Sequence, residues 1–321
     1  MRIVQVAPNI IPLPGSGGIE RVVYNLSEEL VRRGHEVYLY ALAGTHSSAV
    51  VIPYGHRFPR YYELEDFVRQ TLPDDVDIIH DHTHDLNISE VIPSVPTVST
   101  FHTEWAKYNP ARCPVFVSRT KLEQSPHWNR GVFVHNGIDL NRYEFSTRKE
   151  DFLLFLGRID REKGVPAALE VARQTGMRLV IAGPIWDEEH FVQDIVPDME
   201  TIPNAEYVGE VHGEEKKKLL KQAKWLLFPS LGEEQFGLVV IEAMASGTPV
   251  AAFRRGAVPE ILEPFPAFLC DTVEDMARLV RKPSPYSAHS LAMYVRENFS
   301  IEVMTDRYLS VYQRAIEGWD R

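Results

Sequence analysis

The chain has 321 residues, of which 44% are hydrophobic and 25% are charged. These proportions exclude a disordered or fibrous protein, and the length suits two domains of about 100–200 residues each. The formal net charge of −11 argues against a nucleic-acid partner and against a polybasic membrane surface. With only two cysteines, Cys113 and Cys270, the chain is not a disulfide scaffold, and we expect a reducing, cytoplasmic location.

Neither a targeting segment nor a membrane span is predicted. The apolar start, Ile3–Ala7, is interrupted by Gln5 and followed by Pro8, and no small-residue cleavage site comes after it, so a buried strand is the better interpretation. No apolar run approaches the ~18–20 residues of a spanning helix. Peripheral membrane association stays open, although no basic amphipathic stretch favours it.

In the first half of the chain, short runs rich in Val, Ile and Phe alternate with segments of helical periodicity. The segment Gly18–Arg33 places Val22, Leu26 and Leu30 on one face and ends at Gly34, as expected of an amphipathic helix. The predicted strands are Ile3–Ala7, Val37–Leu42, Asp77–His80, Thr97–Phe101, Val115–Val117 and Val132–Val134, and the predicted helices are Gly18–Arg33 and Tyr62–Leu72.

A polar segment, Asn141–Asp151, separates this series from a second one. We therefore predict a first domain at residues 1–145, a second at residues 146–300, and a C-terminal helix at residues 301–321 that either crosses back to the first domain or stays on the second. The second series has predicted strands at Phe152–Leu156, Arg178–Ala182, Tyr207–Val208, Trp225–Pro229 and Val250–Phe253. Its predicted helices are Gly164–Gln174, Glu214–Ala223 and Phe236–Ala245, followed from Thr272 by a helical tail in three pieces.

This alternation of strand and helix predicts an α/β protein made of two Rossmann-like, doubly wound domains, each with a parallel sheet. Ligands of such sheets bind outside the carboxyl ends of the strands. The cleft between the two domains is therefore the expected site, and the informative residues should lie in the loops that follow the strands.

The first such loop runs from Pro14 to Glu20 and contains Gly15, Gly17 and Gly18. Glycines allow the backbone to approach a ligand, and the start of the following helix offers unpaired N–H groups to an anion. The third glycine of the dinucleotide fingerprint is missing. Taken alone, the segment is as well explained by a flexible turn.

The second loop follows the first strand of the second domain and carries Arg158 and Lys163. A planar guanidinium and an ammonium that converge on one point suit a diphosphate. The alternative is a solvated loop in which both cations form ion pairs with Asp160 and Glu162.

The third segment contains two carboxylates separated by seven residues: Glu234, predicted to lie in the loop just before a helix, and Glu242, predicted to lie two turns into it. On a helix, eight residues rotate by only about 80° and rise about 12 Å, so both carboxylates can address one elongated ligand. Because the neighbours of Glu242 are apolar, an unpaired charge there is costly and a partner is expected. The separation is too large for the paired carboxylates of a glycoside hydrolase.

Together these motifs closely resemble the retaining glycosyltransferases of family 4, the group 1 glycosyltransferases. Glu234 to Glu242 is similar to the Glu-x7-Glu signature of that family, Arg158 and Lys163 to its phosphate-binding pair, and Gly17-Gly18 to its N-terminal glycine loop. His135–Asp139 resembles the segment that closes its first domain. The resemblance implies a GT-B fold with two facing domains, a nucleoside-diphosphate sugar as donor, no metal or cofactor, and front-side attack with retention.

The resemblance also implies roles for single residues. Arg158 and Lys163 would hold the diphosphate, Glu234 would contact hydroxyls of the transferred sugar, and Glu242 would bind the ribose hydroxyls. In the first domain, the donor would further contact His102 and the loop glycines Gly17 and Gly18. In the second domain, it would contact the start of the helix that carries Glu242, at Phe236, Gly237 and Leu238, and its base would be recognised by backbone at Gly183 and Val208.

Two other patterns suggest a metal. His80, His82 and His84 alternate along an extended segment, which suits zinc or iron, but a polar loop at a strand end that binds acceptor hydroxyls is the better interpretation, since no matching ligand pair appears elsewhere. Asp75-Val76-Asp77 is a nominal Asp-x-Asp that precedes a strand, so a turn is favoured. Near His102, the aromatic residues Phe101, Trp105 and Tyr108 either stack on a sugar or simply pack.

Charge bears on the acceptor. Residues 1–150 carry 15 Lys and Arg against 18 Asp and Glu, and the remainder carries 19 against 27. Because the first domain is not basic, we expect a soluble small-molecule or glycan acceptor. The function predicted is a metal-independent retaining hexosyltransferase that uses a UDP- or GDP-linked sugar. The alternative is a catalytically silent GT-B protein that binds nucleotide or glycan as a sensor or partner subunit.

Overall fold

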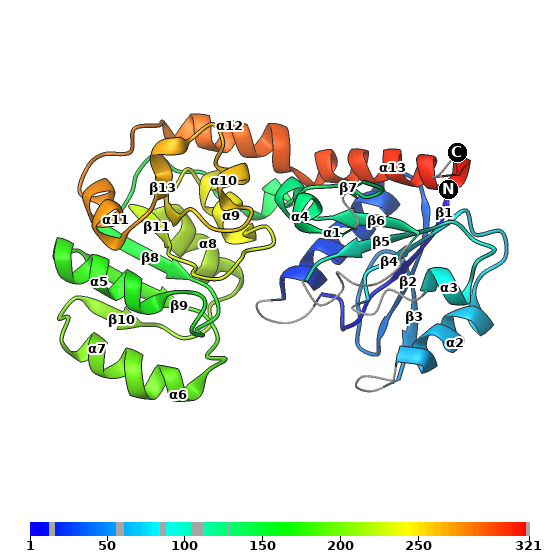
Figure 1. The fold of residues 1–321 in the computed structure, drawn as a ribbon, viewed down its shortest axis with the longest axis horizontal. Coiled ribbons are helices and arrows are strands. Elements are labelled where there is room, and N and C mark those ends of the chain that lie inside the picture. Colours follow the sequence, from blue (N-terminus) through cyan, green and yellow to red (C-terminus); the bar gives the residue numbers. More distant parts are fainter. Residues whose placement is uncertain (13–16, 56–60, 84–87, 104–111, 127–128, 319–321) are drawn as a thin grey trace. The chain divides into compact units, whose positions relative to one another are not determined.

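The computed structural model describes residues 1–12, 17–55, 61–83, 88–103, 112–126 and 129–318. The chain divides into two compact units. Unit 1 contains residues 1–137 together with residues 301–321, and unit 2 contains residues 138–300. In Figure 1, which is coloured along the sequence, the red C-terminal helix lies among the blue and cyan elements of unit 1.

Unit 1 is built on a parallel sheet of seven strands in the order β3-β2-β1-β4-β5-β6-β7. Its strands are β1 (Arg2–Val6), β2 (Glu36–Leu42), β3 (Val50–Tyr54), β4 (Ile78–Asp81), β5 (Thr97–Phe101), β6 (Cys113–Phe116) and β7 (Val132–Phe133). Its helices are α1 (Gly18–Arg32), α2 (Tyr61–Thr71), α3 (Ile88–Val91), α4 (Arg119–Gln124) and α13 (Ile301–Glu317).

Two helices of unit 1 cover the sheet and contact each other. Helix α1 buries Val22, Leu26 and Leu30, which recur at the helical period. Helix α13 packs against α1, β4 and β5, and the Arg33 guanidinium at the end of α1 forms an ion pair with Asp306 of α13. The last helix is therefore part of the core of unit 1.

Unit 2 is built on a parallel sheet of six strands in the order β10-β9-β8-β11-β12-β13. Its strands are β8 (Phe152–Leu156), β9 (Arg178–Ala182), β10 (Ala205–Tyr207), β11 (Trp225–Phe228), β12 (Val250–Phe253) and β13 (Leu269–Cys270). The four central strands, β9, β8, β11 and β12, are almost fully buried, as expected of a parallel sheet with both faces covered.

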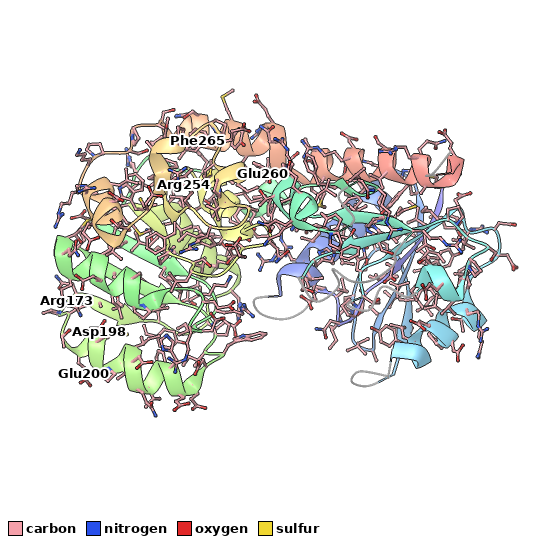
Figure 2. All side chains as sticks on the ribbon, in the orientation of Figure 1. Arg173, Asp198, Glu200, Arg254, Glu260 and Phe265 are labelled. Atoms are coloured by element: carbon pink, nitrogen blue, oxygen red, sulfur yellow. The ribbon has the colours of Figure 1, made fainter. Side chains whose placement is uncertain are left out.

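The helices of unit 2 are α5 (Val165–Thr175), α6 (Glu188–His190), α7 (Val196–Glu200), α8 (Gly213–Gln222), α9 (Leu238–Ala245), α10 (Val258–Ile261), α11 (Val273–Val280) and α12 (Ala288–Phe299), with a turn of π-helix at Phe191–Ile195 between α6 and α7. Side chains link neighbouring helices. The guanidinium of Arg173 on α5, for example, forms an ion pair with Asp198 of α7 (Figure 2).

The predicted doubly wound α/β architecture is confirmed, with two parallel sheets. Sequence analysis missed two strands, the short helices α3, α4 and α10, and one longer helical segment. Strand β3 contains Pro53 and lies at the edge of its sheet, and β13 has only two residues, so neither has a clear period-two pattern. The missed helical segment, residues 188–200, is broken into three short pieces by the π-helical turn.

The segment after Gly137 packs onto unit 2 and contains Lys149, which joins the ends of two helices. The Lys149 Nζ donates to the carbonyl oxygens of Lys221 (2.8 Å) and Ser246 (3.0 Å) and to Thr248 Oγ1 (2.7 Å). Lys221 lies in the last turn of α8, and Ser246 is the C-cap of α9. A cation at these C-terminal ends is favoured by the helix dipoles, and burial lowers the pKa of Lys149 to about 8.

Replacing Lys149 by Met should destabilise unit 2 by about 1–3 kcal/mol, because it leaves partly buried acceptors at both helix ends without their donor. The neighbouring Arg148→Met is the matched control, since Arg148 is exposed and hydrogen-bonds Ser146 through its backbone. Urea unfolding at pH 7 measures both. Equal stability of the two variants would contradict the role assigned to Lys149.

Candidate functional site

The strand order of unit 2 directs attention to two loops. The order reverses between β8 and β11, which are neighbours in the sheet but far apart in the sequence. In open α/β sheets, ligands bind outside the carboxyl ends of the strands at such a reversal. The loop after β8 spans residues 157–164 and the loop after β11 spans residues 229–237, and these two loops contain three of the four predicted catalytic residues.

The loop after β8 is organised by Asp160. One carboxylate oxygen of Asp160 accepts from the backbone N–H groups of Glu162 and Lys163, each at 3.0 Å. The other oxygen lies 3.4 Å from Nη2 of Arg158. The ion pair of the alternative interpretation is therefore present, and the same carboxylate ties the two predicted phosphate-binding cations to one short turn. The Arg158 side chain remains 36% exposed.

The two loops pack directly against each other. Gly164 has a φ of 75°, and a Cβ atom there would lie 2.0 Å from the carbonyl oxygen of Pro229, so only glycine fits. The Leu231 N–H donates to the Glu162 carbonyl at 2.7 Å. This close approach brings the Lys163 ammonium onto Glu234 Oε1 in an ion pair, and Ser230 Oγ also donates to that oxygen at 3.1 Å.

Glu242 is held by a separate set of partners. Its carboxylate is 1% exposed; Lys216 Nζ of α8 lies 2.7 Å from Oε2, and Tyr143 Oη donates to Oε1 at 2.8 Å. The expected charge partner of this carboxylate is thus supplied by the protein. Helix α9 begins at Leu238 rather than Phe236, and Glu234 lies in the loop before it, as predicted. The rotation and rise of a helix therefore apply to only part of the interval between Glu234 and Glu242.

The remaining donor-binding candidates of unit 2 lie at the same edge of its sheet. Gly237 is the N-cap of α9, with Leu238 as the first helical residue, while the Phe236 side chain is buried. Gly183 follows β9 and donates its N–H to Gly209 at 2.8 Å, and Val208 follows β10 with 40% of its surface exposed. All of these predicted residues follow the carboxyl ends of strands.

In unit 1, the predicted residues also lie at the carboxyl edge of the sheet. Gly17 is the N-cap of α1 and Gly18 its first residue, and His102 follows β5 directly. The predictions on Gly15, His84, Trp105 and Tyr108 fall outside the described residues.

His102 is joined to a buried histidine pair. His82 Nδ1 lies 2.9 Å from His102 Nε2, and His82 Nε2 lies 2.6 Å from Gln5 Oε1. Burial and the neighbouring histidines lower the pKa of His82 well below 6.5, so its ring is neutral at pH 7. Because an amide oxygen only accepts, His82 Nε2 donates to Gln5, its Nδ1 accepts, and His102 Nε2 is the donor.

His80 lies within β4, as the predicted strand Asp77–His80 requires, and not in the polar loop suggested for the segment His80 to His84. Its Nδ1 is 2.6 Å from Tyr312 Oη and its Nε2 is 2.7 Å from Thr100 Oγ1. Thr100 in turn contacts Tyr308 Oη at 3.1 Å. Burial lowers the pKa of His80 well below 6.5. Within the described part of the chain, no group of three or more His, Cys, Asp or Glu side chains is placed to hold a metal ion.

Some residues of these arrangements were missed by sequence reasoning. Tyr312 lies 232 residues from His80, so no local pattern connects them. Lys216 belongs to a run of three lysines that has the appearance of a solvated helix face. Its signal was indirect, because the apolar neighbours of Glu242 required a cation from elsewhere. Trp186 had a visible signal, a large aromatic residue three positions after a strand-end glycine.

The two loops, the strand orders and the parallel sheets define a glycosyltransferase of the GT-B type. A family model of group 1 glycosyl transferases matches residues 140–283, and a model of glycosyltransferase family 4 matches residues 16–142. The chain belongs to this family, the group 1 glycosyltransferases of family 4. It is an enzyme that transfers a sugar from a nucleotide-sugar.

Three relatives illustrate the match. The phosphatidyl-myo-inositol mannosyltransferase of Mycobacterium tuberculosis is 26% identical over 373 residues, which cover 100% of this chain and 93% of that protein. AviGT4, a glycosyltransferase involved in avilamycin A biosynthesis, has a crystal structure with a TM-score of 0.79 at 25% identity, covering 99% and 98% of the two chains. HepE of Anabaena in complex with UDP-glucose shares the fold, with a TM-score of 0.76 at 16% identity over 98% and 99%.

The helices of the described residues include none that is both long enough and apolar enough to cross a membrane.

Next to the histidines of unit 1 lies a buried carboxyl group, Asp81. Its Oδ1 accepts from the N–H and the hydroxyl of Thr83 at 2.9 and 2.8 Å, and its Oδ2 lies 3.4 Å from the Ile88 N–H. Complete burial outweighs these hydrogen bonds and raises the pKa of Asp81 to about 7. The folded state therefore binds this proton more tightly than the unfolded state does.

Asp81→Asn should change the pH dependence of stability. Because the folded pKa is raised from 3.8 to about 7, the contribution of Asp81 is complete below pH 4 and is lost as the pH rises through 7. The urea-unfolding free energy of the variant should therefore improve relative to wild type by about 2–3 kcal/mol between pH 5 and pH 8. The difference should stay constant from pH 8 to 9, above this titration. Titration of His80 and His82 affects both proteins and cancels in the comparison, so a pH-independent difference would refute the assignment.

Proposed function

We propose that the enzyme transfers a hexose from a UDP- or GDP-linked donor to a hydroxyl of a soluble small-molecule or glycan acceptor, with retention and without a metal. The observation that carries the proposal is the pair of cations in the loop after β8, at the topological reversal of the sheet: Asp160 contacts the guanidinium of Arg158 and the backbone N–H of Lys163 within one turn. Two cations and the backbone N–H groups at the start of α9 suit a diphosphate.

On this proposal, the chemistry is electrostatic. As the sugar–phosphate bond breaks, negative charge develops on the departing diphosphate, and fixed cations stabilise that charge without reorganising. The leaving phosphate takes the proton of the acceptor hydroxyl, so no side-chain base is needed. Glu234 is held by Lys163 and Ser230. We assign it to hydroxyls of the transferred sugar, and its ion pair orients Lys163 at the same time.

Glu242 would bind the ribose hydroxyls. Its two oxygens are already oriented by Lys216 and Tyr143, so the carboxylate is fixed before a ligand arrives. The backbone at Phe236, Gly237 and Leu238 would supply N–H groups to the donor, and the backbone at Gly183 and Val208 would recognise the base. In unit 1, we propose that His102 contacts the donor sugar and that Gly17 and Gly18 approach its phosphates. With two cysteines in the chain, we propose a cytoplasmic location.

Arg158→Ala should abolish most donor turnover, by about 100-fold or more, and weaken nucleoside-diphosphate affinity by about 10- to 100-fold, because it removes a charge-assisted contact. Release of diphosphate from a panel of UDP-, GDP- and ADP-linked sugars measures turnover, and calorimetry with the free diphosphates measures affinity. The same panel identifies the base.

Arg161→Ala is the matched control, since Arg161 is three residues away, 60% exposed and paired with Asp187 and Asp194. It should retain turnover and affinity. Normal turnover in Arg158→Ala, or equal losses in both variants, would overturn the assignment of the phosphate site.

A soluble acceptor predicts no binding to membranes. The mycobacterial relative is named a phosphatidyl-myo-inositol mannosyltransferase. Binding to phosphatidylinositol membranes is therefore the property to test. We expect less than about 10% of the protein to co-sediment with vesicles of phosphatidylcholine and 30% phosphatidylinositol at 150 mM NaCl, because the chain is acidic and exposed charges are screened. Vesicles of pure phosphatidylcholine are the control. Selective sedimentation with the anionic vesicles would contradict this part of the proposal.

A further inference from the structure

Trp186 is unusually exposed for a large aromatic residue. It is 65% exposed in the loop after β9, and the Arg158 guanidinium carbon lies 4.5 Å from the centre of its ring. Large aromatic side chains are usually buried, and exposed ones that stand beside other apolar groups tend to mark ligand sites. Ile185, Val208 and Leu231, also exposed, come from this loop and from the loops after β10 and β11.

The backbone that carries Trp186 is fixed to the backbone that carries Arg158. The Trp186 N–H donates to the Ile159 carbonyl at 3.0 Å, and the Ile159 N–H donates to the Pro184 carbonyl at 2.8 Å. The two loops approach so closely that a Cβ atom at Gly183 would lie 1.8 Å from the Gly157 carbonyl oxygen. The backbone of Trp186 is therefore fixed relative to the residue that follows Arg158, and from this position its ring lies against the Arg158 guanidinium.

The stack leaves the hydrogen-bonding edge of Arg158 available. A guanidinium uses its flat face against an aromatic ring, while its five N–H donors point outward in the plane. In Arg158, Nη2 lies 3.4 Å from Asp160, and the indole of Trp186 lies against one flat face of the guanidinium. A long, partly exposed arginine otherwise loses rotamer freedom when it binds an anion, and a side chain that is already ordered loses less.

We propose that Trp186 is a positioning residue for the diphosphate group of the donor, acting by holding the Arg158 guanidinium in its binding orientation through the indole face. This inference rests on the proposed role of Arg158 as a phosphate ligand. It explains why an exposed tryptophan stands on one of the most constrained turns of unit 2. It also explains how a single guanidinium is held for an anion in the more acidic half of the chain, where residues 151–321 carry 19 Lys and Arg against 27 Asp and Glu.

The test uses inorganic pyrophosphate as the probe and the full-length protein. Trp186→Leu keeps an apolar side chain but removes the aromatic face, whereas Trp186→Phe keeps a smaller face. By calorimetry, Trp186→Leu should weaken pyrophosphate affinity by about two- to tenfold, and Trp186→Phe should stay within about twofold of wild type. Both variants should keep the wild-type melting temperature, because the side chain is exposed.

The difference in fluorescence emission between wild type and Trp186→Phe isolates the emission of Trp186. This emission should respond to pyrophosphate, and the response should be lost in Arg158→Ala.

The outcomes separate the two proposals. Wild-type affinity in Trp186→Leu, or equal weakening in the Leu and Phe variants, overturns the role of the indole face while the phosphate site stands. A response of Trp186 emission that persists in Arg158→Ala also overturns it, because the ring would then sense the anion without the guanidinium. Wild-type pyrophosphate affinity in Arg158→Ala overturns the phosphate site itself, and the positioning role falls with it.

Discussion

The candidate site of unit 2 depends on one contact, the packing of the loop after β8 against the loop after β11. Backbone meets backbone at Gly164 and Pro229, where no side chain fits, and the Leu231 N–H closes the contact on the Glu162 carbonyl. Lys163 and Glu234 are 71 residues apart in sequence and form an ion pair because this contact brings them together. Any ligand held by the two loops therefore depends on Gly164, a position at which no side chain larger than a hydrogen atom fits.

A second set of interactions orients the carboxylate on α9. Burying a charge is costly unless it is paired and hydrogen-bonded, and Glu242 meets this requirement with one partner from α8 and one from the segment after Gly137. Lys149 of the same segment holds the C-terminal ends of both helices. The polar stretch that separates the two series of strands in the sequence is thus built into unit 2, where it supports the helix that carries Glu242.

Much of the fold was readable from the sequence because parallel strands that are buried on both faces form continuous apolar runs, such as Phe152–Leu156 and Trp225–Phe228. The positions of Arg158, Lys163 and Glu234 were readable because they follow such runs. The partners of Glu242 and the His82–Gln5 contact were not, since they join segments that only the folded topology brings together. Strand β3 was missed for a different reason: at the edge of a sheet it tolerates Pro53 and needs no regular pattern.

Because the last helix belongs to unit 1, it affects the order in which the two units can fold during synthesis. Tyr308 and Tyr312 are fully buried and complete the hydrogen-bonded histidine cluster at the centre of the first sheet. During synthesis, the first 137 residues leave the ribosome long before these two tyrosines do, whereas residues 138–300 form their unit from contiguous sequence. Domains commonly fold in the order in which they emerge. Here unit 2 can finish first, because its sequence is contiguous, whereas the first unit stays incomplete until the final helix is made. Until then the His80 ring lacks its partner Tyr312.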